Sequence, residues 1–406
     1  MNNASTRVYG YRWLVLAAFM LITVMNQASW ITFAPITSEA ALYYRCPELV
    51  IGLLSLSFMA IYVLTAIPAA WVIDTWGFRP AVSIGAFLTA AGALARGFFS
   101  ARLALVFVSH AVIALGQPLV LGAITKLAAR WFPANERATA SGFGTLSIYL
   151  GILIAMFITP VLTIGYGIRG MLLIYGASAT ASAILFLAAA RERPPTPPGP
   201  PGQDDRSLMF DGLKSMLKNK DFVLLMVIFF IGLGMFNAVT TWIEAIVRSR
   251  GFSISQAGTL GGLMLVGGIV GALIIPMISD NRRRRKPFII LALIGLMPGL
   301  LGVTFATRYW LLLSSGFLFG FFLLSAGPIG FQYGAEISHP APEGTSNSFL
   351  LLMGQISGIL FILGMDAFKM PTGSMSGSLV VLLGLTAVGA VLAALLRESP
   401  ILHQRS

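Results

Sequence analysis

Apolar runs long enough to cross a lipid bilayer dominate this sequence. A spanning helix needs about 20 predominantly apolar residues. Only 10% of the 406 residues are charged, against about 25% in soluble domains. The runs cover residues 13–36, 48–73, 79–99, 102–129, 136–163, 169–190, 221–247, 255–279, 287–306, 309–335, 345–368 and 376–396. We therefore expect an all-α polytopic membrane protein with 12 transmembrane helices, and not a soluble or disordered chain.

The lysines and arginines are distributed unevenly between alternate loops. The net charge is +12, and most of the 27 basic residues fall on the side of the predicted helices that also holds both chain termini. Cytoplasmic loops of membrane proteins carry such an excess. We expect an integral protein of the inner or plasma membrane of the cell, with both termini in the cytoplasm. Because topology accounts for the positive charge, we expect no nucleic-acid partner.

A proline-rich segment divides the chain. Residues 191–206 read Arg-Glu-Arg-Pro-Pro-Thr-Pro-Pro-Gly-Pro-Pro-Gly-Gln-Asp-Asp-Arg, a composition typical of a stiff, solvated linker. Six predicted spans lie on each side of it. We expect an N-terminal six-helix bundle over residues 1–190, a cytoplasmic proline-rich and basic linker over 191–220, and a C-terminal six-helix bundle over 221–406.

The two halves repeat one another at a nearly constant spacing. Asp74, which ends the second span, recurs as Asp280 at the end of the eighth, and residues 190–194 recur as 396–400. Four further pairs are Pro133 and Pro340, Glu136 and Glu343, Ser141 and Ser348, and Gly151 and Gly358. An even number of spans per half gives both copies the same orientation, and carriers with parallel repeats bind their substrate between the halves. We therefore expect two pseudo-symmetric six-helix bundles that work by alternating access.

The turn after the second span carries a candidate gating motif. It runs from Asp74 through Gly77 to Arg79. An ionised aspartate at a helix end can pair with an arginine and can favour a neighbouring helix N-terminus. We expect Asp74 to pair with Arg130, at the inner end of the fourth span, in a latch that closes when the cytoplasmic face is shut. A solvated turn without this role is the alternative.

Acidic residues of the second half occupy comparable positions. Asp280 precedes four arginines at 282–285, which we interpret mainly as a cytoplasmic anchor. Glu336 and Glu343 flank the loop between the tenth and eleventh spans. We expect Glu343 to favour the N-terminus of the eleventh span. Glu336 is expected to pair with Arg130 or with the arginines after Asp280, and a plain interfacial position is the alternative.

No aspartate, glutamate, lysine or arginine falls near the middle of a predicted span. Glu244, Asp366 and Lys369 lie near outer ends of their spans. Charges inside a helix bundle are costly and usually mark proton or ion relays. A neutral or cationic solute that moves down its gradient therefore fits the sequence better than an anion or a proton-coupled substrate.

Polar and aromatic side chains do occur at depth, in spans that would line the cavity of a two-bundle carrier. The candidate solute-binding residues are Trp30, Tyr149, Phe236, Asn237, Thr240 and Gln355. The ring face of Trp30 can hold a cation, and Gln355 offers a donor and an acceptor without charge. Interhelical hydrogen bonding is the alternative role for each residue, and it is the role we expect for His110.

Five stretches closely resemble the feline leukaemia virus subgroup C receptor family of major facilitators. They are residues 26–30, 74–77, 234–241, 327–346 and 355–361, and the part from 327 to 361 is the most specific. The resemblance implies the major facilitator fold and a carrier for choline or ethanolamine, in a family that is also associated with haem.

The same resemblance implies roles for individual residues. The family builds its choline cage on a span-one tryptophan and a span-eleven glutamine, which match Trp30 and Gln355. Its span-seven tyrosine falls on Asn237, and its span-five glutamine falls on Tyr149. The chain has three histidines, which provide no paired axial ligands for haem. We therefore expect neither a cofactor nor a bound metal.

We conclude from the sequence that the chain is a facilitative carrier of a small cationic or zwitterionic solute of the choline/ethanolamine type. The alternative is a proton-coupled symporter or antiporter of an organic acid or drug-like compound. An enzyme is not expected, because no nucleophile, base and orienting group occur together. The expected partners are the solute and the lipid bilayer, with no obligate protein partner. The expected gating residues are Asp74, Gly77, Arg79, Arg130, Asp280 and Glu336.

Overall fold

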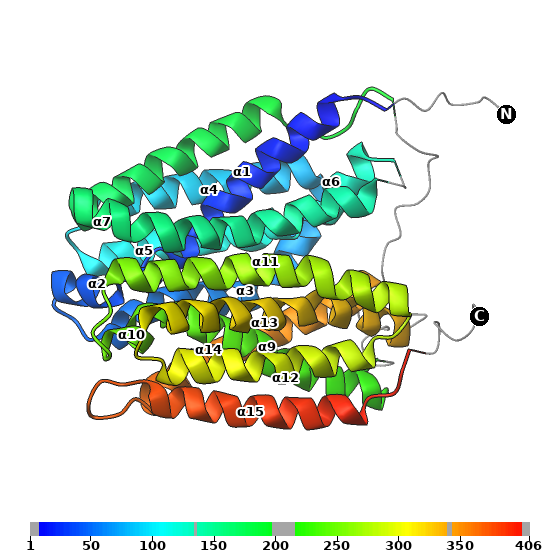
Figure 1. Cartoon of the computed structure of the whole chain (residues 1–406). Coiled ribbons are helices and arrows are strands. Elements are labelled where there is room, and N and C mark those ends of the chain that lie inside the picture. The colour runs from blue at the N-terminus through cyan, green and yellow to red at the C-terminus, as the bar shows by residue number, and fades with distance from the viewer. Residues whose placement is uncertain (1–7, 134–135, 197–215, 339–342, 400–406) are drawn as a thin grey trace. The chain divides into compact units, whose positions relative to one another are not determined.

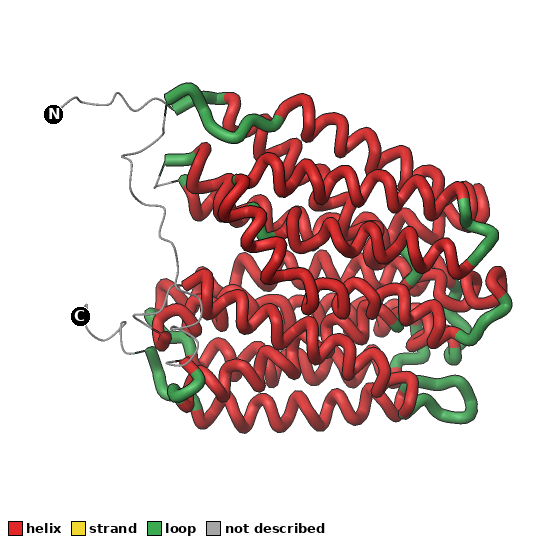
Figure 2. The backbone as a smooth tube through the Cα atoms, turned by 180° about the vertical axis from the view of Figure 1, so that it is seen from behind, coloured by secondary structure: helices red, strands yellow, loops and turns green. Residues whose placement is uncertain are grey.

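The computed structural model describes residues 8–133, 136–196, 216–338 and 343–399. These residues form helices joined by short connections, and no strand occurs among them (Figure 2). The chain divides into two compact units, unit 1 over residues 1–205 and unit 2 over residues 206–406. Unit 1 runs from blue to green and unit 2 from green to red in Figure 1.

Unit 1 is built from long apolar helices and three short ones. They are α1 (Tyr11–Ile31), the 3-10 turn η1 (Ala34–Ile36), α2 (Thr37–Tyr44), α3 (Glu48–Trp76), α4 (Phe78–Phe98), α5 (Leu103–Leu121), α6 (Ile124–Trp131) and α7 (Arg137–Ala189). The backbone of α7 leaves the helical region at Gly167, with φ 68° and ψ 174°. Since this conformation suits only glycine, Gly167 separates two spans within α7.

Unit 2 has the same kind of architecture. Its helices are α9 (Lys220–Thr241), α10 (Ile243–Arg248), α11 (Ile254–Arg282), α12 (Lys286–Phe305), α13 (Tyr309–Ser338), α14 (Glu343–Ala367) and α15 (Ser376–Leu395). A capping box opens α11, where the Ser253 hydroxyl accepts the Gln256 N–H and the Gln256 side chain accepts the Ser253 N–H. These reciprocal bonds satisfy donors that the first turn of a helix leaves free.

The hydropathy-based fold prediction is confirmed. Eleven helical stretches within the described residues are long and apolar enough to cross a membrane, and α7 contains both the fifth and the sixth predicted spans. The predicted first, fourth and seventh spans each continue into a short second helix, namely α2, α6 and α10. Hydropathy identifies such spans well, but it does not show these breaks because the residues on both sides are apolar.

Helices pack closely where small residues line the contact. In unit 1, α1 packs on α7 and α4 packs on α5; in unit 2, α9 packs on α14 and α11 packs on α13. A Cβ atom added to Gly320 on α13 would lie 1.8 Å from the backbone oxygen of Met264 on α11, and one added to Gly271 would lie 1.9 Å from the oxygen of Phe321. Lipid does not drive helices together by hydrophobicity, so this backbone-to-backbone packing supplies the association.

Candidate solute site and charge networks

Two of the predicted solute-binding residues lie on adjacent helices of unit 1. Trp30 on α1 is buried, and its indole Nε1 donates a hydrogen bond to the Ser55 backbone oxygen on α3 at 3.1 Å. Tyr149 on α7 is half-buried, and its hydroxyl makes no hydrogen bond within the described part of the chain. Gly151, two residues beyond Tyr149, packs against Val24 of α1. The hydrogen bond to Ser55 fixes the orientation of the Trp30 ring and occupies its only polar group.

The other four candidates lie together in unit 2. Phe236, Asn237 and Thr240 are buried on α9, and the Asn237 amide Nδ2 donates to the backbone oxygen of Gly354 on α14 at 3.1 Å. Gln355, the next residue of α14, is half-buried. The structure thus brings Asn237 and Gln355 to the same level of the α9–α14 contact.

Thr240 is unusual among these residues. Its hydroxyl is fully buried and has no hydrogen-bond partner among the described residues. Threonine hydroxyls in helices commonly bond to a backbone oxygen one turn earlier, and buried polar atoms rarely stay unpaired. The side-chain amide of Gln355 makes no hydrogen bond to described residues either. Unit 2 therefore holds uncharged donors and acceptors that no described residue bonds to.

The gating motif lies at the end of unit 1 where α1 begins and α3 ends, which we call the charged end of unit 1. Lys126 Nζ on α6 is 3.4 Å from Asp74 Oδ1, and it also donates to the Asp74 backbone oxygen at 3.0 Å. In this structure Asp74 pairs with Lys126 and not with the predicted Arg130, whose Nη1 lies 3.7 Å from Glu192 Oε1. The reason is the break between α5 and α6, which lets Gly122 pack on Ile73 and brings the first turn of α6 beside Asp74.

Gly77 and Arg79 contact a carboxylate that sequence analysis did not assign. Glu192 Oε2 accepts the backbone N–H of Arg79 at 2.8 Å, in the first turn of α4. Gly77 has a positive φ of 102°, and a Cβ there would lie 2.3 Å from Glu192 Oε1. A carboxylate at a helix N-terminus is favourable because it meets free N–H groups and the positive end of the helix dipole. Glycine at 77 is therefore required both by the backbone and by Glu192.

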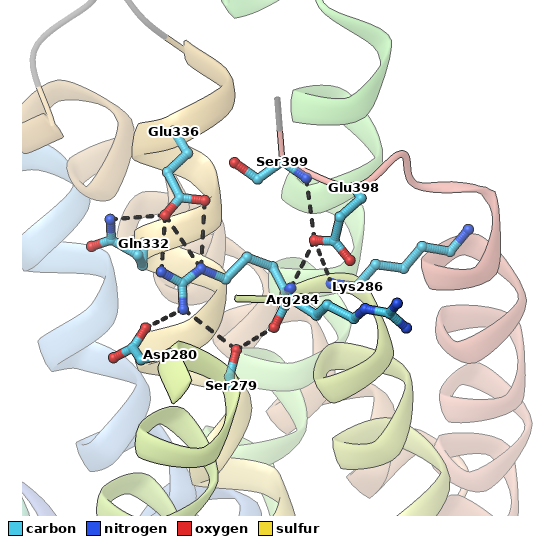
Figure 3. Close-up of polar contacts among 9 residues, drawn as sticks. Ser279, Asp280, Arg284, Lys286, Gln332, Glu336, Glu398 and Ser399 are labelled. Carbon is cyan, nitrogen blue, oxygen red and sulfur yellow. Dashed lines mark hydrogen bonds and ion pairs between the residues drawn. The ribbon is translucent and has the colours of Figure 1, made fainter. Parts of the chain in front are cut away.

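The corresponding end of unit 2, its charged end, holds a buried ion network (Figure 3). Arg285 Nη2 lies 3.0 Å from Glu336 Oε1, and both side chains are only 7% exposed. Arg285 also pairs with Asp280, and Gln332 donates to Glu336 Oε1 at 3.1 Å. Burial lowers the pKa of Arg285, but the hydrogen bonds to Glu336 and Asp280 raise it more, so its pKa stands above the ordinary value.

This network confirms one sequence-based expectation and corrects another. Glu336 does pair with an arginine that follows Asp280, as expected. The interpretation of residues 282–285 as an anchor is wrong for Arg285, because its guanidinium is buried and bound by two carboxylates, whereas Arg282, Arg283 and Arg284 are exposed. Glu343 is the first residue of α14, and its side chain lies outside the described residues.

The two charged ends share one capping device. Glu398 Oε1 accepts the backbone N–H groups of Arg285 at 2.7 Å and Lys286 at 3.3 Å (Figure 3). Glu192 does the same for Arg79 at the start of α4. The signal for both carboxylates was present in the repeated segments 190–194 and 396–400, although the sequence alone did not show which groups they would meet.

Two charged residues are buried more deeply than their positions in the spans suggest. Arg96, near the end of α4, is completely buried in unit 1. Its Nη1 bonds to the Ser29 backbone oxygen and to His110 Nδ1, both at 3.0 Å, so that His110 has the expected interhelical role. Glu244 in the first turn of α10 is 1% exposed, and its Oε1 is 3.9 Å from Arg248 Nε.

Comparison with known proteins decides the family. The sequence matches the family described as the Major Facilitator Superfamily over residues 19–362. The chain belongs to the Major Facilitator Superfamily. Solute carrier family 49 member A3 of Xenopus tropicalis is 32% identical to this facilitator over 381 residues, which are 89% of the chain and 79% of the relative. The choline/ethanolamine transporter FLVCR2 of Rattus norvegicus is 27% identical over 98% of this chain and 76% of the relative. The resemblance to the feline leukaemia virus subgroup C receptor family is thereby confirmed.

Solved structures agree with the fold of this major facilitator. A bacterial homologue of the human lysosomal transporter Spinster, in an inward-facing and unoccupied conformation, superposes with a TM-score of 0.77 at 16% identity, covering 95% of this chain and 97% of that chain. The D-xylose-proton symporter gives a TM-score of 0.75 at 15% identity, covering 96% and 99%. These similarities show the fold alone. The family and the sequence relatives identify an integral membrane transporter and not an enzyme.

Proposed function

We propose that this major facilitator carries a small cationic or zwitterionic solute of the choline/ethanolamine type, by facilitative alternating access, with both termini in the cytoplasm. The observation that carries the proposal is the hydrogen bonding of the Trp30 side chain. Its indole N–H is already bonded to Ser55, so the remaining chemistry of this side chain is its aromatic face. A desolvated aromatic face attracts a quaternary ammonium by about 2 kcal/mol or more.

Unit 2 supplies groups that suit the polar end of such a solute. The Thr240 hydroxyl and the Gln355 amide have no partners within the described part of the chain, and Asn237 is tied to Gly354 beside them. Choline and ethanolamine each carry a hydroxyl, which needs a donor and an acceptor and no counter-charge. Relatives called choline/ethanolamine transporters in rat and human support the same solute class.

We place the gate at the two charged ends. The residues expected to act there are Asp74, Gly77, Arg79, Arg130, Asp280 and Glu336, to which the structure adds Lys126, Glu192 and Arg285 as their contacts. Ion pairs can form and break between conformations with little backbone change, as transitions that repack interface salt bridges illustrate. The exposed Asp74–Lys126 pair suits such switching better than the buried Arg285–Glu336 pair does.

Replacement of Trp30 tests the proposed solute. Trp30→Ala removes the ring face and should weaken choline binding about thirtyfold, the equivalent of ~2 kcal/mol, whereas Trp30→Phe should keep most of the affinity. Binding of radiolabelled choline to the purified protein measures both. The exposed Trp310 of α13 provides the matched control, since Trp310→Ala should leave the affinity unchanged. Equal losses in the alanine and phenylalanine variants would remove the aromatic argument.

The burial of Glu244 favours proton-coupled transport as a second candidate function. A carboxylate withdrawn from water can take up and release a proton during a transport cycle. Under the facilitative proposal, uptake into proteoliposomes should be the same with and without a protonophore, and Glu244→Gln should change it no more than twofold. Glu39→Gln, at an exposed site on α2, is the control. Uptake that collapses with the proton gradient and is lost only in Glu244→Gln would establish proton coupling instead.

A further inference from the structure

Arg96 presents a buried positive charge that no acidic side chain of the described residues neutralises. Its guanidinium lies inside unit 1 with 0% exposure, and none of the ion pairs among the described residues involves it. Its Nη1 and Nη2 groups bond only to neutral atoms, the Ser29 backbone oxygen, His110 Nδ1 and the Thr32 hydroxyl. Burying a charge without a counter-charge is costly, and buried charges in proteins are normally paired.

The contact with Arg96 fixes the tautomer of His110. A guanidinium can only donate hydrogen bonds, so His110 Nδ1 must accept the bond from Arg96 Nη1 at 3.0 Å. The proton of the neutral ring is therefore on Nε2. This Nε2 atom is buried on the far side of the ring from Arg96, within reach of the Leu54 backbone, so His110 holds the guanidinium in place.

Three buried atoms at or near the guanidinium are unpartnered in the described part of the chain. They are Arg96 Nε, Ser29 Oγ and the Tyr44 hydroxyl. Ser29 is adjacent to the guanidinium through its backbone, and Tyr44 lies within electrostatic reach of it. By contrast, the nearby Tyr175 hydroxyl is already bonded to Thr159 at 2.8 Å. All three groups can donate a hydrogen bond, and none of them carries negative charge.

We propose that Arg96, Ser29 and Tyr44, the Arg96 cluster, form a binding site for one small monovalent anionic group, with His110 holding the guanidinium in position. A fixed positive charge with a donor-only set of neighbours is complementary to an anion and repels a cation. The Phe33 ring lies against the guanidinium, with its centroid 5.7 Å from the guanidinium carbon, and the Phe58 ring packs on His110 with a centroid distance of 4.7 Å.

The anionic group has two possible sources. A chloride ion from solution would occupy the site whatever the protein transports. The carboxylate of a zwitterionic solute would also satisfy it, and this source rests on the proposed function, because Ser29 is the neighbour of Trp30 in the sequence. The two sources share the same recognition chemistry and differ in whether a positively charged solute moiety is present.

Anion binding to the purified full-length protein tests the site. Anomalous diffraction from crystals grown in bromide should show one peak within hydrogen-bond distance of Arg96 Nε. Thermal unfolding at constant ionic strength should show saturable stabilisation by chloride over gluconate, because a ligand that binds the folded state stabilises it. Ser29→Ala and Tyr44→Phe should each weaken the halide affinity about tenfold, since each removes one hydrogen bond to a charged group. Neither variant removes the buried charge, so both should fold.

Control variants and competing ligands separate the outcomes. Ser109→Ala changes a serine on α5 whose hydroxyl already bonds to Leu105, and it should leave the halide affinity unchanged. Competition by glycine betaine but not by choline would identify the solute carboxylate as the source. Halide binding that neither ligand affects would identify free chloride. The proposal is overturned if bromide gives no peak and neither halide nor betaine stabilises the protein in a way that depends on Ser29 and Tyr44. Failure of choline to bind Trp30 would leave the halide result intact.

Discussion

Replacing Arg285 by methionine is expected to destabilise unit 2 by about 3–5 kcal/mol, the usual cost of removing one partner of a buried ion pair. The substitution leaves the Glu336 carboxylate, which is 7% exposed, without its cation. Gln332 remains as a donor to Glu336, but one neutral amide cannot offset the desolvation of a full charge. Thermal unfolding in detergent, followed by the loss of monodisperse protein, measures the effect.

A double variant distinguishes an unpaired charge from lost packing. Arg285→Met combined with Glu336→Met removes both charges, and apolar replacement of a buried pair is often neutral or stabilising. We expect the double variant to recover most of the stability that Arg285→Met loses. Asp280→Asn provides a control at the same network, because the Asp280 side chain is 62% exposed and exposed pairs contribute about 0–1 kcal/mol. A double variant as unstable as the single one would show that packing, not charge, holds this region together.

Gly320→Ala is expected to be the most disruptive small substitution in the described part of the chain. The added Cβ would lie 1.8 Å from the Met264 backbone oxygen, and the obstacle is main chain and cannot rotate away. Overpacking a tight contact usually costs about 1–3 kcal/mol, and a clash with a neighbouring helix backbone should exceed this range. Expression level and thermal unfolding of the purified variant would report the loss.

Gly364→Ala is the matched control for Gly320→Ala. Gly364 lies in α14, and a Cβ there would meet no atom within 4 Å. Alanine is the better helix former by about 1 kcal/mol, so Gly364→Ala should be neutral or slightly stabilising. Equal unfolding temperatures for the two variants would show that the close approach of α11 and α13 does not contribute to stability.

The spans were predictable because lipid imposes a simple constraint on sequence. Long apolar stretches such as those of α12 and α15 have no alternative to a spanning helix, and their ends were predicted within a residue or two. The candidate solute residues of unit 2 were predicted as a group, and the Asn237–Gly354 bond shows that α9 and α14 do meet there. The length of the apolar runs predicted the spans, and the depth of polar residues together with the family resemblance predicted the group in unit 2.

Individual ion pairs were not predictable in the same way. Asp74 had several basic residues within reach, and the choice of Lys126 over Arg130 depends on a break in the helix that hydropathy does not mark. Arg96 stands near a helix end, where the sequence suggests exposure, yet the helices of unit 1 enclose it completely. Such pairings depend on how three or more helices pack together, and the order of residues along the chain does not show that packing.

The hydrogen bond from Asn237 to the Gly354 backbone has a mechanical consequence. It joins a side chain of α9 to the main chain of α14 inside a buried contact, where breaking it would leave two polar groups unsatisfied at a cost of about 1–3 kcal/mol each. The two helices should therefore travel as a single rigid element whenever the carrier changes conformation. The distances between Asn237, Thr240 and Gln355 would then stay constant from the binding of the solute to its release. Selectivity for the solute would therefore be the same in every conformation of the carrier.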